Sequence, residues 1–276
     1  AVFVQNPQSD EHTMLRQTII ANLLDTLQNN SFNAQKNVWL YEIGKTYFIE
    51  EPADKINSGV KENQILSGVM TGETNQNLWK NIAKPDFYSL KGVLEELFKL
   101  LNIQSRVKLN QNDECAYLHP GRSAKVVLLG KKPETIGYFG EIYPLLKDKM
   151  KLNQEVYLFE LDLGKLIEAS NIQTVKYKQL PSFAGVQRDI AFAIEKSIKN
   201  EDIVLSVRKS ADSKIFKSAE LFDIYEGEHI QEGFKSLAYR ITLQDENAAL
   251  TDEIINNEIA KIKSGLMKKF PAVSFR

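Results

Sequence analysis

The chain has 276 residues, 43% of them hydrophobic and 26% charged, which is the mixture of a soluble globular protein with one large domain or two ordinary ones. Its formal net charge of −1 argues against a protein that holds nucleic acid by overall charge. No run approaches the roughly 18 apolar residues of a transmembrane helix. The single cysteine, Cys115, excludes an internal disulfide and cannot assemble a zinc or iron–sulfur site by itself.

The start of the chain has no basic and apolar pattern of a secretion signal, so we expect a cytoplasmic protein with no membrane partner. The first residue is Ala1, and the chain opens directly on an apolar stretch, which leads us to expect a piece of a longer protein. Because the composition is unremarkable, the patterns along the chain must decide the fold class.

Two helices are predicted in the first part of the chain. Apolar residues at spacings of three and four predict one over about residues 13–29, with Ser9 or Asp10 as its N-cap. The same spacing of leucines predicts a second helix over residues 87–101, with Asp86 as its cap.

Between and after these helices the sequence predicts strands. They are expected at residues 38–44, 65–70, 125–129, 135–139 and 156–163. The first is expected to end in a turn or bulge at Gly44, and the polar stretch 50–63 to form an exposed loop. Because the strands do not alternate regularly with helices, the pattern indicates an α+β architecture and not a doubly wound one.

The composition turns polar near residues 168–179, and we place a domain boundary there, between residues 1–178 and residues 179–276. The second domain is predicted to contain a strand, a helix, two strands, a helix and a strand, at residues 189–195, 200–210, 217–225, 236–244, 252–270 and 272–275. This is the β-α-β-β-α-β order of a ferredoxin-like fold. Thr251 is the expected cap of its last helix, and Pro271 ends that helix.

Two glycine-containing strings each have a functional and a structural interpretation. Residues 119–124 (HPGRSA) combine an imidazole, an arginine and a glycine that could bind an anion. We favour a rigid turn that leads into the strand at Lys125. Residues 137–140 (GYFG) could cradle a phosphate, but a tight turn is favoured there as well.

We predict no catalytic residue and no metal ligand in this chain. The sequence has no phosphate-binding loop of the GxxxxGK[ST] or GxGxxG kind. The three histidines, His12, His119 and His229, are far apart and lack the spacing of metal ligands. Glu95 and Glu96 are expected on the solvated face of a helix, and not as an acid–base pair.

Several strings together resemble the C-terminal part of the β subunit of bacterial phenylalanyl-tRNA synthetases. In the first domain they are NPQS at residues 6–9, YEIGK at 41–45, DFYSLKG at 86–92, HPGRSA at 119–124 and GYFGEIYP at 137–144. In the second domain they are PSF at 181–183, RDI at 188–190, LFDIY at 221–225, SLAYR at 236–240 and the final Arg276. Their order and spacing cover nearly the whole chain, which makes the resemblance specific. The sequence departs from the family at Ala21-Asn22, where the family usually has Pro-Gly. A continuous helix is therefore possible at these positions.

The resemblance implies an antiparallel-sheet domain like that of class II synthetases but without an active site, followed by a ferredoxin-fold anticodon-binding domain. It implies a parent (αβ)2 heterotetramer that activates phenylalanine with ATP and Mg2+ in its α subunit and transfers it to tRNA. The chain would hold no cofactor and would serve α-subunit assembly and recognition of the anticodon of phenylalanine tRNA. The sequence agrees, since it lacks the arginine motifs with which class II synthetases hold ATP. The family's editing and β-subunit magnesium sites lie upstream of these residues.

In a ferredoxin-like fold, two helices cover one face of the sheet and leave the other face open. Alternation along the strands predicts which side chains face outward. An open face of small residues and isolated arginines lets bases lie flat and stack on guanidinium planes. From alternation and from the resemblance, we predict tRNA contacts at Arg188, Asp189, Ala191, Asp223, Ser236, Ala238, Arg240, Ser274 and Arg276.

Charge does not strengthen this prediction, because residues 181–276 contain 14 Lys and Arg against 15 Asp and Glu. We therefore expect contacts directed at bases, with few phosphates neutralised and a shallow dependence on salt. A local basic edge is open at Lys261, Lys263, Lys268 and Lys269, although a solvated helix face is the simpler interpretation.

An alternative function comes from another class, in which both domains mediate protein assembly and the ferredoxin-like domain docks a partner or a regulatory ligand. An exposed apolar patch on the open sheet face would favour this alternative, whereas a groove lined by arginine and small polar residues would favour RNA. An independent enzyme is a third interpretation, and it requires a pocket where ionisable groups converge.

Overall fold

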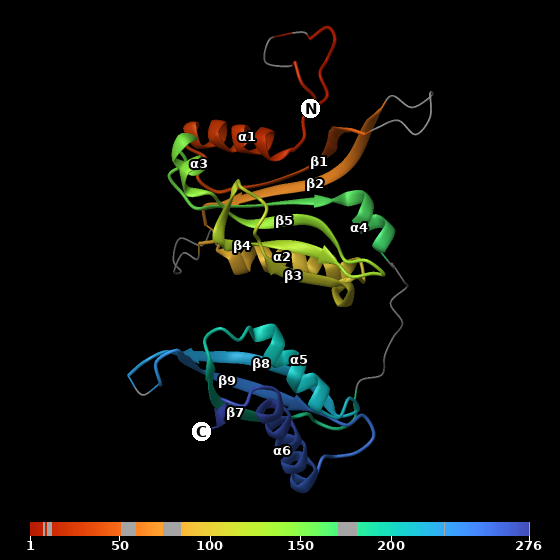
Figure 1. Cartoon of the computed structure of the whole chain (residues 1–276), viewed down its shortest axis with the longest axis vertical. Coiled ribbons are helices and arrows are strands. Elements are labelled where there is room, and N and C mark those ends of the chain that lie inside the picture. The colour runs from red at the N-terminus through yellow and green to blue at the C-terminus, as the bar shows by residue number, and fades with distance from the viewer. Residues whose placement is uncertain are drawn as a thin grey trace. The chain divides into compact units, whose positions relative to one another are not determined.

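The computed structural model describes residues 1–7, 9, 13–50, 59–73, 84–170, 181–228 and 230–275. The chain divides into two compact units, Ala1–Val175 and Lys176–Arg276, each with its own sheet and hydrophobic core (Figure 1). The boundary predicted between residues 178 and 179 lies outside the described residues and stays a prediction.

The first unit is built on a six-stranded antiparallel sheet with the strand order β1-β2-β6-β5-β4-β3. Its strands are β1 (Val38–Ile49), β2 (Val60–Thr71), β3 (Val107–Gln111), β4 (Leu118–Leu128), β5 (Glu134–Ile142) and β6 (Val156–Asp162). Each strand predicted here overlaps an observed one. Strand β3 is not predicted, because its residues are half-buried or exposed without the alternation of a strand that has one buried face. The loop predicted at residues 50–63 is too long, because β2 already begins at Val60; its residues 51–58 lie outside the described part.

Helices cover both faces of this sheet (Figure 1). They are α1 (Ile20–Phe32), α2 (Phe87–Leu100), α3 (Pro144–Lys149) and α4 (Leu163–Ala169), with a short 3-10 helix, η2 (Gln104–Arg106). Alternate residues of β6 separate the two cores: Val156 and Leu158 pack with α1, whereas Tyr157 and Phe159 pack with α2 and α4. A strand that is buried on both faces has a nearly continuous run of apolar residues, and the sequence of β6 contains such a run.

Helix α1 begins at Ile20, later than predicted. The described residues just before it are not helical, and Phe3 forms an antiparallel bridge with Met14 near the predicted start. The N-cap position of this helix is Ile19, so the predicted caps are wrong; Ser9 lies well before the helix, and Asp10 lies outside the described residues.

A carboxylate on β6 supports the start of α1 in place of a local cap. Glu160 accepts hydrogen bonds from the Thr18 hydroxyl (2.8 Å) and from the backbone N–H of Ile19 (2.9 Å). The helix then continues without a break through Ala21 and Asn22. A partner this distant in the sequence explains why local patterns misplaced the first turn.

Helix α2 begins where the sequence predicts. The Asp86 carboxylate accepts the Ser89 backbone N–H (2.7 Å), and the Ser89 hydroxyl accepts the Asp86 backbone N–H (3.2 Å), which completes a capping box. Glu95 and Glu96 are exposed and pair with lysines of the same helix. This confirms that they lie on a solvated face.

No turn forms at Gly44, which lies in β1 opposite Ile65. The space above this glycine is filled by Arg16, whose guanidinium donates to the Glu42 carboxylate (3.0 Å) and to the Lys45 carbonyl (2.9 Å). A Cβ at this position would collide with that guanidinium. The glycine thus permits a close approach, and the predicted turn or bulge is wrong.

The two other glycine strings are strand irregularities and not turns. Gly137 and Gly140 lie inside β5 with φ of +156° and +151°, and each lies directly against the backbone of a neighbouring strand. Residues 119–124 lie within β4, whose pairing with β5 shifts between Leu118 and Ser123. The turns predicted at both strings are therefore absent. Contacts between neighbouring strands determine these irregularities, and local sequence patterns do not reveal such contacts.

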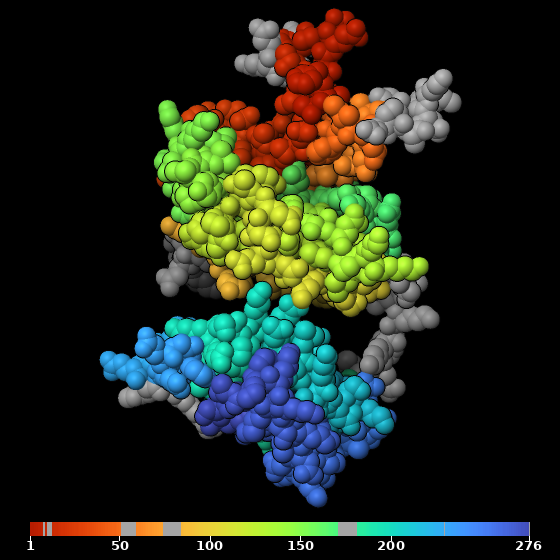
Figure 2. Space-filling view, viewed as in Figure 1, coloured from red at the N-terminus to blue at the C-terminus, as the bar shows by residue number. Residues whose placement is uncertain are grey.

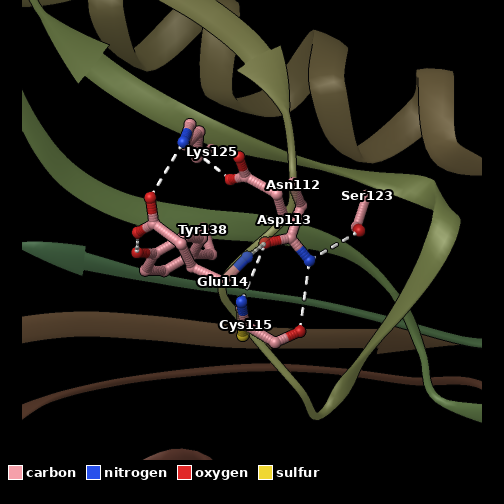
Figure 3. Close-up of polar contacts among 7 residues, drawn as sticks. All are labelled: Asn112, Asp113, Glu114, Cys115, Ser123, Lys125 and Tyr138. Atoms are coloured by element: carbon pink, nitrogen blue, oxygen red, sulfur yellow. Dashed lines mark hydrogen bonds and ion pairs between the residues drawn. The ribbon is translucent and has the colours of Figure 1, made fainter.

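Asn112 organises the connection between β3 and β4 (Figure 3). Its buried amide accepts the backbone N–H of Cys115 (2.9 Å) and donates to the Ser123 hydroxyl (3.0 Å). On the outer side of this loop, Lys125 pairs with Glu114 (2.9 Å). Burial raises the pKa of the Cys115 thiol, which keeps it protonated and unreactive at neutral pH.

The second unit is a four-stranded antiparallel sheet with the order β10-β7-β9-β8. Its elements are β7 (Val186–Glu195), α5 (Asn200–Ser210), β8 (Phe216–Tyr225), β9 (Phe234–Leu243), α6 (Asp252–Lys269) and β10 (Ser274–Phe275). This confirms the predicted ferredoxin-like order, with α5 at its predicted bounds. The Thr251 hydroxyl accepts the Ile254 N–H (3.4 Å), as expected of the cap of α6.

Both helices pack on one face of this sheet, and Figure 2 shows them side by side on the surface of the unit. The residues that alternate with the predicted outward-facing ones are all buried: Ile190, Phe192 and Ile194 of β7, and Leu237, Tyr239, Ile241 and Leu243 of β9. Burying one such leucine or isoleucine contributes about 1.5–3 kcal/mol, so this alternation fixes which face is left open.

Candidate nucleic-acid interface

The open face of the second sheet includes three cross-strand rows that hold most of the predicted contact residues. The register places Arg240 between Asp189 and Glu220, Ala238 between Ala191 and Asp223, and Ser236 between Ala193 and Tyr225. Residues directly opposite each other on neighbouring strands point to the same face. Ser274 of β10 extends the third row, because it pairs with Ala193.

Arg240 lies at the centre of the first row and is held on two sides. Its Nε and Nη2 each donate to a different carboxylate oxygen of Asp189, both at 2.9 Å. Its Cζ lies 5.0 Å from the centroid of the Phe222 ring. A bidentate ion pair and a cation–π contact together fix the plane of a side chain that is otherwise flexible.

The ion pair also balances the charge of this arginine. Hydrogen bonds from Arg240 hold the pKa of Asp189 below its usual value, and the same carboxylate raises the pKa of Arg240. Both groups therefore stay ionised at neutral pH. Glu220, on the other side, favours the charged guanidinium as well. The row presents a planar guanidinium without an excess of positive charge.

Phe222 reaches this site because β8 is irregular. The pairing with β9 shifts between Leu221 and Asp223, so that Phe222 is an extra residue in the ladder. A regular strand would place Leu221 and Asp223 on one face, but the bulge leaves Leu221 packed against the core while Asp223 joins the open face. Sequence reasoning missed Phe222 for this reason, since alternation does not report a bulge.

The other two rows form a floor of small side chains. Ala191, Ala193, Ser236 and Ala238 are all half-buried, and none extends more than one heavy atom beyond Cβ. A flat group can therefore approach the strands closely. At the end of the third row, Tyr225 is 45% exposed and adds a second aromatic ring to this face.

The structure brings most of the predicted contact residues together, with two exceptions. The open face holds Asp189, Ala191, Asp223, Ser236, Ala238, Arg240 and Ser274. Arg188 has the parity of the buried face and pairs instead with Asp252 at the start of α6 (3.4 Å). Arg276 lies outside the described residues.

Among the described residues of both units, no group of three or more His, Cys, Asp or Glu side chains could hold a metal ion. In the same portion of the chain, no helix is both long and apolar enough to cross a membrane. The basic edge considered near the end of α6 is spread out: Lys261 pairs with Glu258, and Lys263 lies over the Phe275 ring.

Comparison with known proteins decides the family. Residues 1–163, more than half of the chain, match the family model described as the phenylalanyl tRNA synthetase beta chain CLM domain. The chain belongs to the phenylalanyl-tRNA synthetase β-chain family. Residues 181–274 match a second model, the ferredoxin-fold anticodon binding domain, which coincides with the second sheet and its helices.

Three curated relatives are named phenylalanine–tRNA ligase beta subunits. The protein of Bacillus subtilis (strain 168) is 34% identical over 268 residues, 97% of this chain and 32% of that protein. That of Staphylococcus epidermidis (strain RP62A) is 35% identical over 95% of this chain and 31% of its own length. That of Geobacillus kaustophilus is 34% identical over 97% and 32%. The chain thus spans about a third of the length of the relatives it matches.

Among solved structures, pyrrolysyl-tRNA synthetase from Desulfitobacterium hafniense is similar over 61% of this chain and 54% of that one, with 17% identity and a TM-score of 0.42. The family matches confirm the resemblance seen in the sequence. They also confirm the predicted α+β fold class, a synthetase-type antiparallel-sheet domain followed by a ferredoxin-fold domain. The residue assignments on the open face are not tested by these matches and stay predictions.

Proposed function

We propose that this chain is the C-terminal region of a phenylalanine–tRNA ligase β subunit, which binds the anticodon loop of phenylalanine tRNA and assembles with the α subunit. The RNA-binding part of this proposal rests on the guanidinium of Arg240, which is held by Asp189 and lies against the ring of Phe222. The match of this unit to the anticodon-binding family supports the same ligand.

This face suits bases better than phosphates. Because Asp189 balances the charge of Arg240, the face offers planar surfaces and hydrogen-bonding groups without a strong positive field. Stacking of a base on an aromatic or guanidinium plane contributes about 1–3 kcal/mol. Asp223 and Ser236 provide hydrogen-bonding groups for base edges. We expect selective binding of an unpaired loop with a shallow salt dependence.

The test is the affinity of the chain for a fluorescently labelled anticodon stem-loop, compared with the same stem carrying a shuffled loop. Arg240→Ala should weaken binding of the matching loop about tenfold or more, since one stacking contact is lost. Arg240→Lys keeps the charge without the planar fork and should lose nearly as much. Arg208→Ala removes the same charge from the exposed side of α5 and should change little. Unchanged affinity in Arg240→Ala refutes the RNA site.

The assembly half of the proposal rests on an exposed apolar surface of the first unit. Trp39, Tyr41 and Ile43 alternate along the outer strand β1 and are 51%, 76% and 59% exposed. Together with Val93 and Leu97 of α2, the first two border a hollow of about 320 Å3. Contiguous apolar surface of this kind marks protein interfaces, and we propose that the α subunit of an (αβ)2 assembly covers it.

Co-purification with a co-expressed α subunit tests this surface. Tyr41→Lys places a charge in the middle of the apolar strand and should abolish retention of the α subunit. Met267→Lys, at a residue of α6 that is 51% exposed, should leave it unchanged. Equal retention by the two variants would remove β1 from the proposed interface.

The reaction itself belongs, in this proposal, to the α subunit, where phenylalanine is activated with ATP and Mg2+ in the cytoplasm. The chain contributes RNA contacts and assembly. Phenylalanine-dependent exchange of pyrophosphate into ATP by the isolated chain would contradict this division of roles.

A second candidate for the ferredoxin-fold unit is the docking of a protein partner. Phe222 and Tyr225 of β8 are 50% and 45% exposed, which favours it. Under this alternative, Tyr225→Lys weakens retention of the α subunit, while Arg240→Ala leaves RNA affinity unchanged. The row of Arg240 over small residues favours RNA.

A further inference from the structure

A separate hollow of the first unit lies beside the N-terminus of α2 and takes no part in the functions proposed above. It measures about 350 Å3, and its walls include Asp86, Phe87 and Tyr88, with Arg122 of β4 and Tyr157 of β6. This volume lies at the lower end of the range for small-molecule sites, roughly 300–1,000 Å3.

Two opposite charges stand at this hollow. Arg122 is 56% exposed; its Nε lies 3.1 Å from a Glu141 carboxylate oxygen, and its Nη2 lies 3.3 Å from Nε2 of His119. A guanidinium has five N–H donors, so these contacts leave donors for a further anionic group. Hydrogen bonds from Ser89 hold the pKa of Asp86 below its usual value, so this carboxylate is ionised at neutral pH.

Aromatic side chains line the same hollow and form an aromatic wall. Phe87 stacks on Phe139, with ring centroids 5.1 Å apart and an angle of 18° between the planes. Tyr88, which is 73% exposed, meets Phe87 edge to face at 5.5 Å, and Tyr157 is almost completely buried. Aromatic rings grouped in this way favour a ligand with a flat apolar group.

A buried acid behind the wall adds an independent observation. Glu141 is only 3% exposed, points to the same face of the sheet as Tyr157, and approaches Arg122 through an oxygen that accepts no hydrogen bond of ordinary geometry among the described residues. Burial raises the pKa of this carboxyl. A buried carboxyl whose pKa is raised by burial and which pairs with a charged group at a hollow is a candidate for a functional site.

We propose that this hollow binds a small zwitterion with a flat apolar group, of which an aromatic amino acid is the simplest example. Arg122 meets its carboxylate, Asp86 meets its ammonium group, and the rings of Tyr88 and Tyr157 contact its side chain. The arrangement does not suit a nucleotide, because one arginine faces an ionised Asp86, and Glu155, the neighbour of Glu141, is also held ionised by Lys147. The inference does not depend on RNA binding or on assembly.

The experiment titrates the chain by NMR with L-phenylalanine and with three analogues that each lack one group. They are 3-phenylpropionate without the ammonium, 2-phenylethylamine without the carboxylate, and L-alanine without the ring. L-phenylalanine should bind saturably, and each analogue should bind about tenfold more weakly, the effect of one lost charge-assisted or apolar contact. Absence of saturable binding overturns the proposal. A hollow that only receives a side chain of a partner subunit gives that result.

Two variants separate recognition from damage to the fold. Asp86→Asn keeps a good N-cap and should weaken L-phenylalanine about tenfold while leaving 3-phenylpropionate unchanged. Arg122→Lys keeps a cation beside Glu141 and should weaken L-phenylalanine while leaving 2-phenylethylamine unchanged. Glu96→Gln, on the exposed face of α2, is the matched control. Equal weakening of every probe by either variant contradicts the assigned contacts.

Discussion

Replacement of Asp189 by asparagine tests whether the open face selects bases because its arginine is neutralised. In the native chain, both carboxylate oxygens of Asp189 lie 2.9 Å from nitrogens of Arg240. Asparagine has nearly the same shape and keeps one oxygen that can accept from Arg240, but it removes the negative charge. The guanidinium should therefore stay near Phe222, 5.0 Å from its ring centroid, with its positive charge no longer balanced.

The expected magnitude follows from counting phosphates. One additional unbalanced cation neutralises at most one more phosphate, which makes the plot of log K against log salt concentration steeper by about 0.7 for single-stranded RNA. Glu220 lies opposite Arg240 on β8 and offsets part of the new charge, so about 0.7 is an upper bound. The affinity for any RNA should rise at low salt, and the selectivity for the matching loop should fall.

Fluorescence anisotropy at several potassium chloride concentrations measures both quantities, with the matching and the shuffled stem-loop as ligands. Asp252→Asn is the matched control, because this carboxylate pairs with Arg188 on the helix side of the sheet (3.4 Å). It should alter neither slope nor selectivity. If Asp189→Asn also leaves both unchanged, the reasoning about charge balance is refuted.

The pH dependence gives an independent check on the same ion pair. Hydrogen bonds from Arg240 lower the folded-state pKa of Asp189, so the pair is intact above the ordinary pKa and is lost only as pH falls through the lowered value. Selectivity of the native chain should therefore be constant between about pH 5 and pH 8, since both members stay charged there. A loss of selectivity within that range would assign the effect to another group.

Three further predictions concern the ring on the open face and the two cores. Phe222→Leu should weaken the stem-loop about tenfold, whereas Phe222→Tyr keeps the ring and should change affinity little, as measured by anisotropy. Asn112→Ala should lower the free energy of unfolding by about 2–3 kcal/mol, because it orphans buried partners, while Glu114→Gln at the exposed ion pair should cost under about 1 kcal/mol in the same urea titration. Ile262→Ala should destabilise the second unit by about 2–5 kcal/mol and exposed Met267→Ala by much less; equal thermal shifts would contradict the assigned core.

Features encoded within one element were predictable from the sequence. The bounds of α5, the cap of α2 at Asp86 and the cap of α6 at Thr251 depend on residues a few positions apart. The alternation along β7 and β9 assigned the inner and outer faces, because an apolar side chain on the wrong face would lose its burial. The candidate residues from Ala191 to Arg240 followed from that alternation and from the family resemblance.

Features that depend on distant partners were not predictable in this way. The start of α1 depends on Glu160, which is supplied by β6 late in the unit. Glycine is required in β5 because the backbone of neighbouring strands lies directly against Gly137 and Gly140. It is required at Gly44 because the Arg16 guanidinium fills the space of a side chain. Arg188 is a predicted tRNA contact because of its place in a matching string, but its parity and its pairing with Asp252 place it on the helix-covered side of the sheet.

The sequence by itself determined the family, the order of elements and the faces of the second sheet, since these follow from local periodicity and from ordered strings along the chain. Only the tertiary structure decided that Asp189 neutralises Arg240, that a bulge brings Phe222 beneath it, and that Arg122 and Asp86 face one hollow. The physical reason is that the register between strands, and the irregularities within it, are set by contacts between segments far apart in the chain.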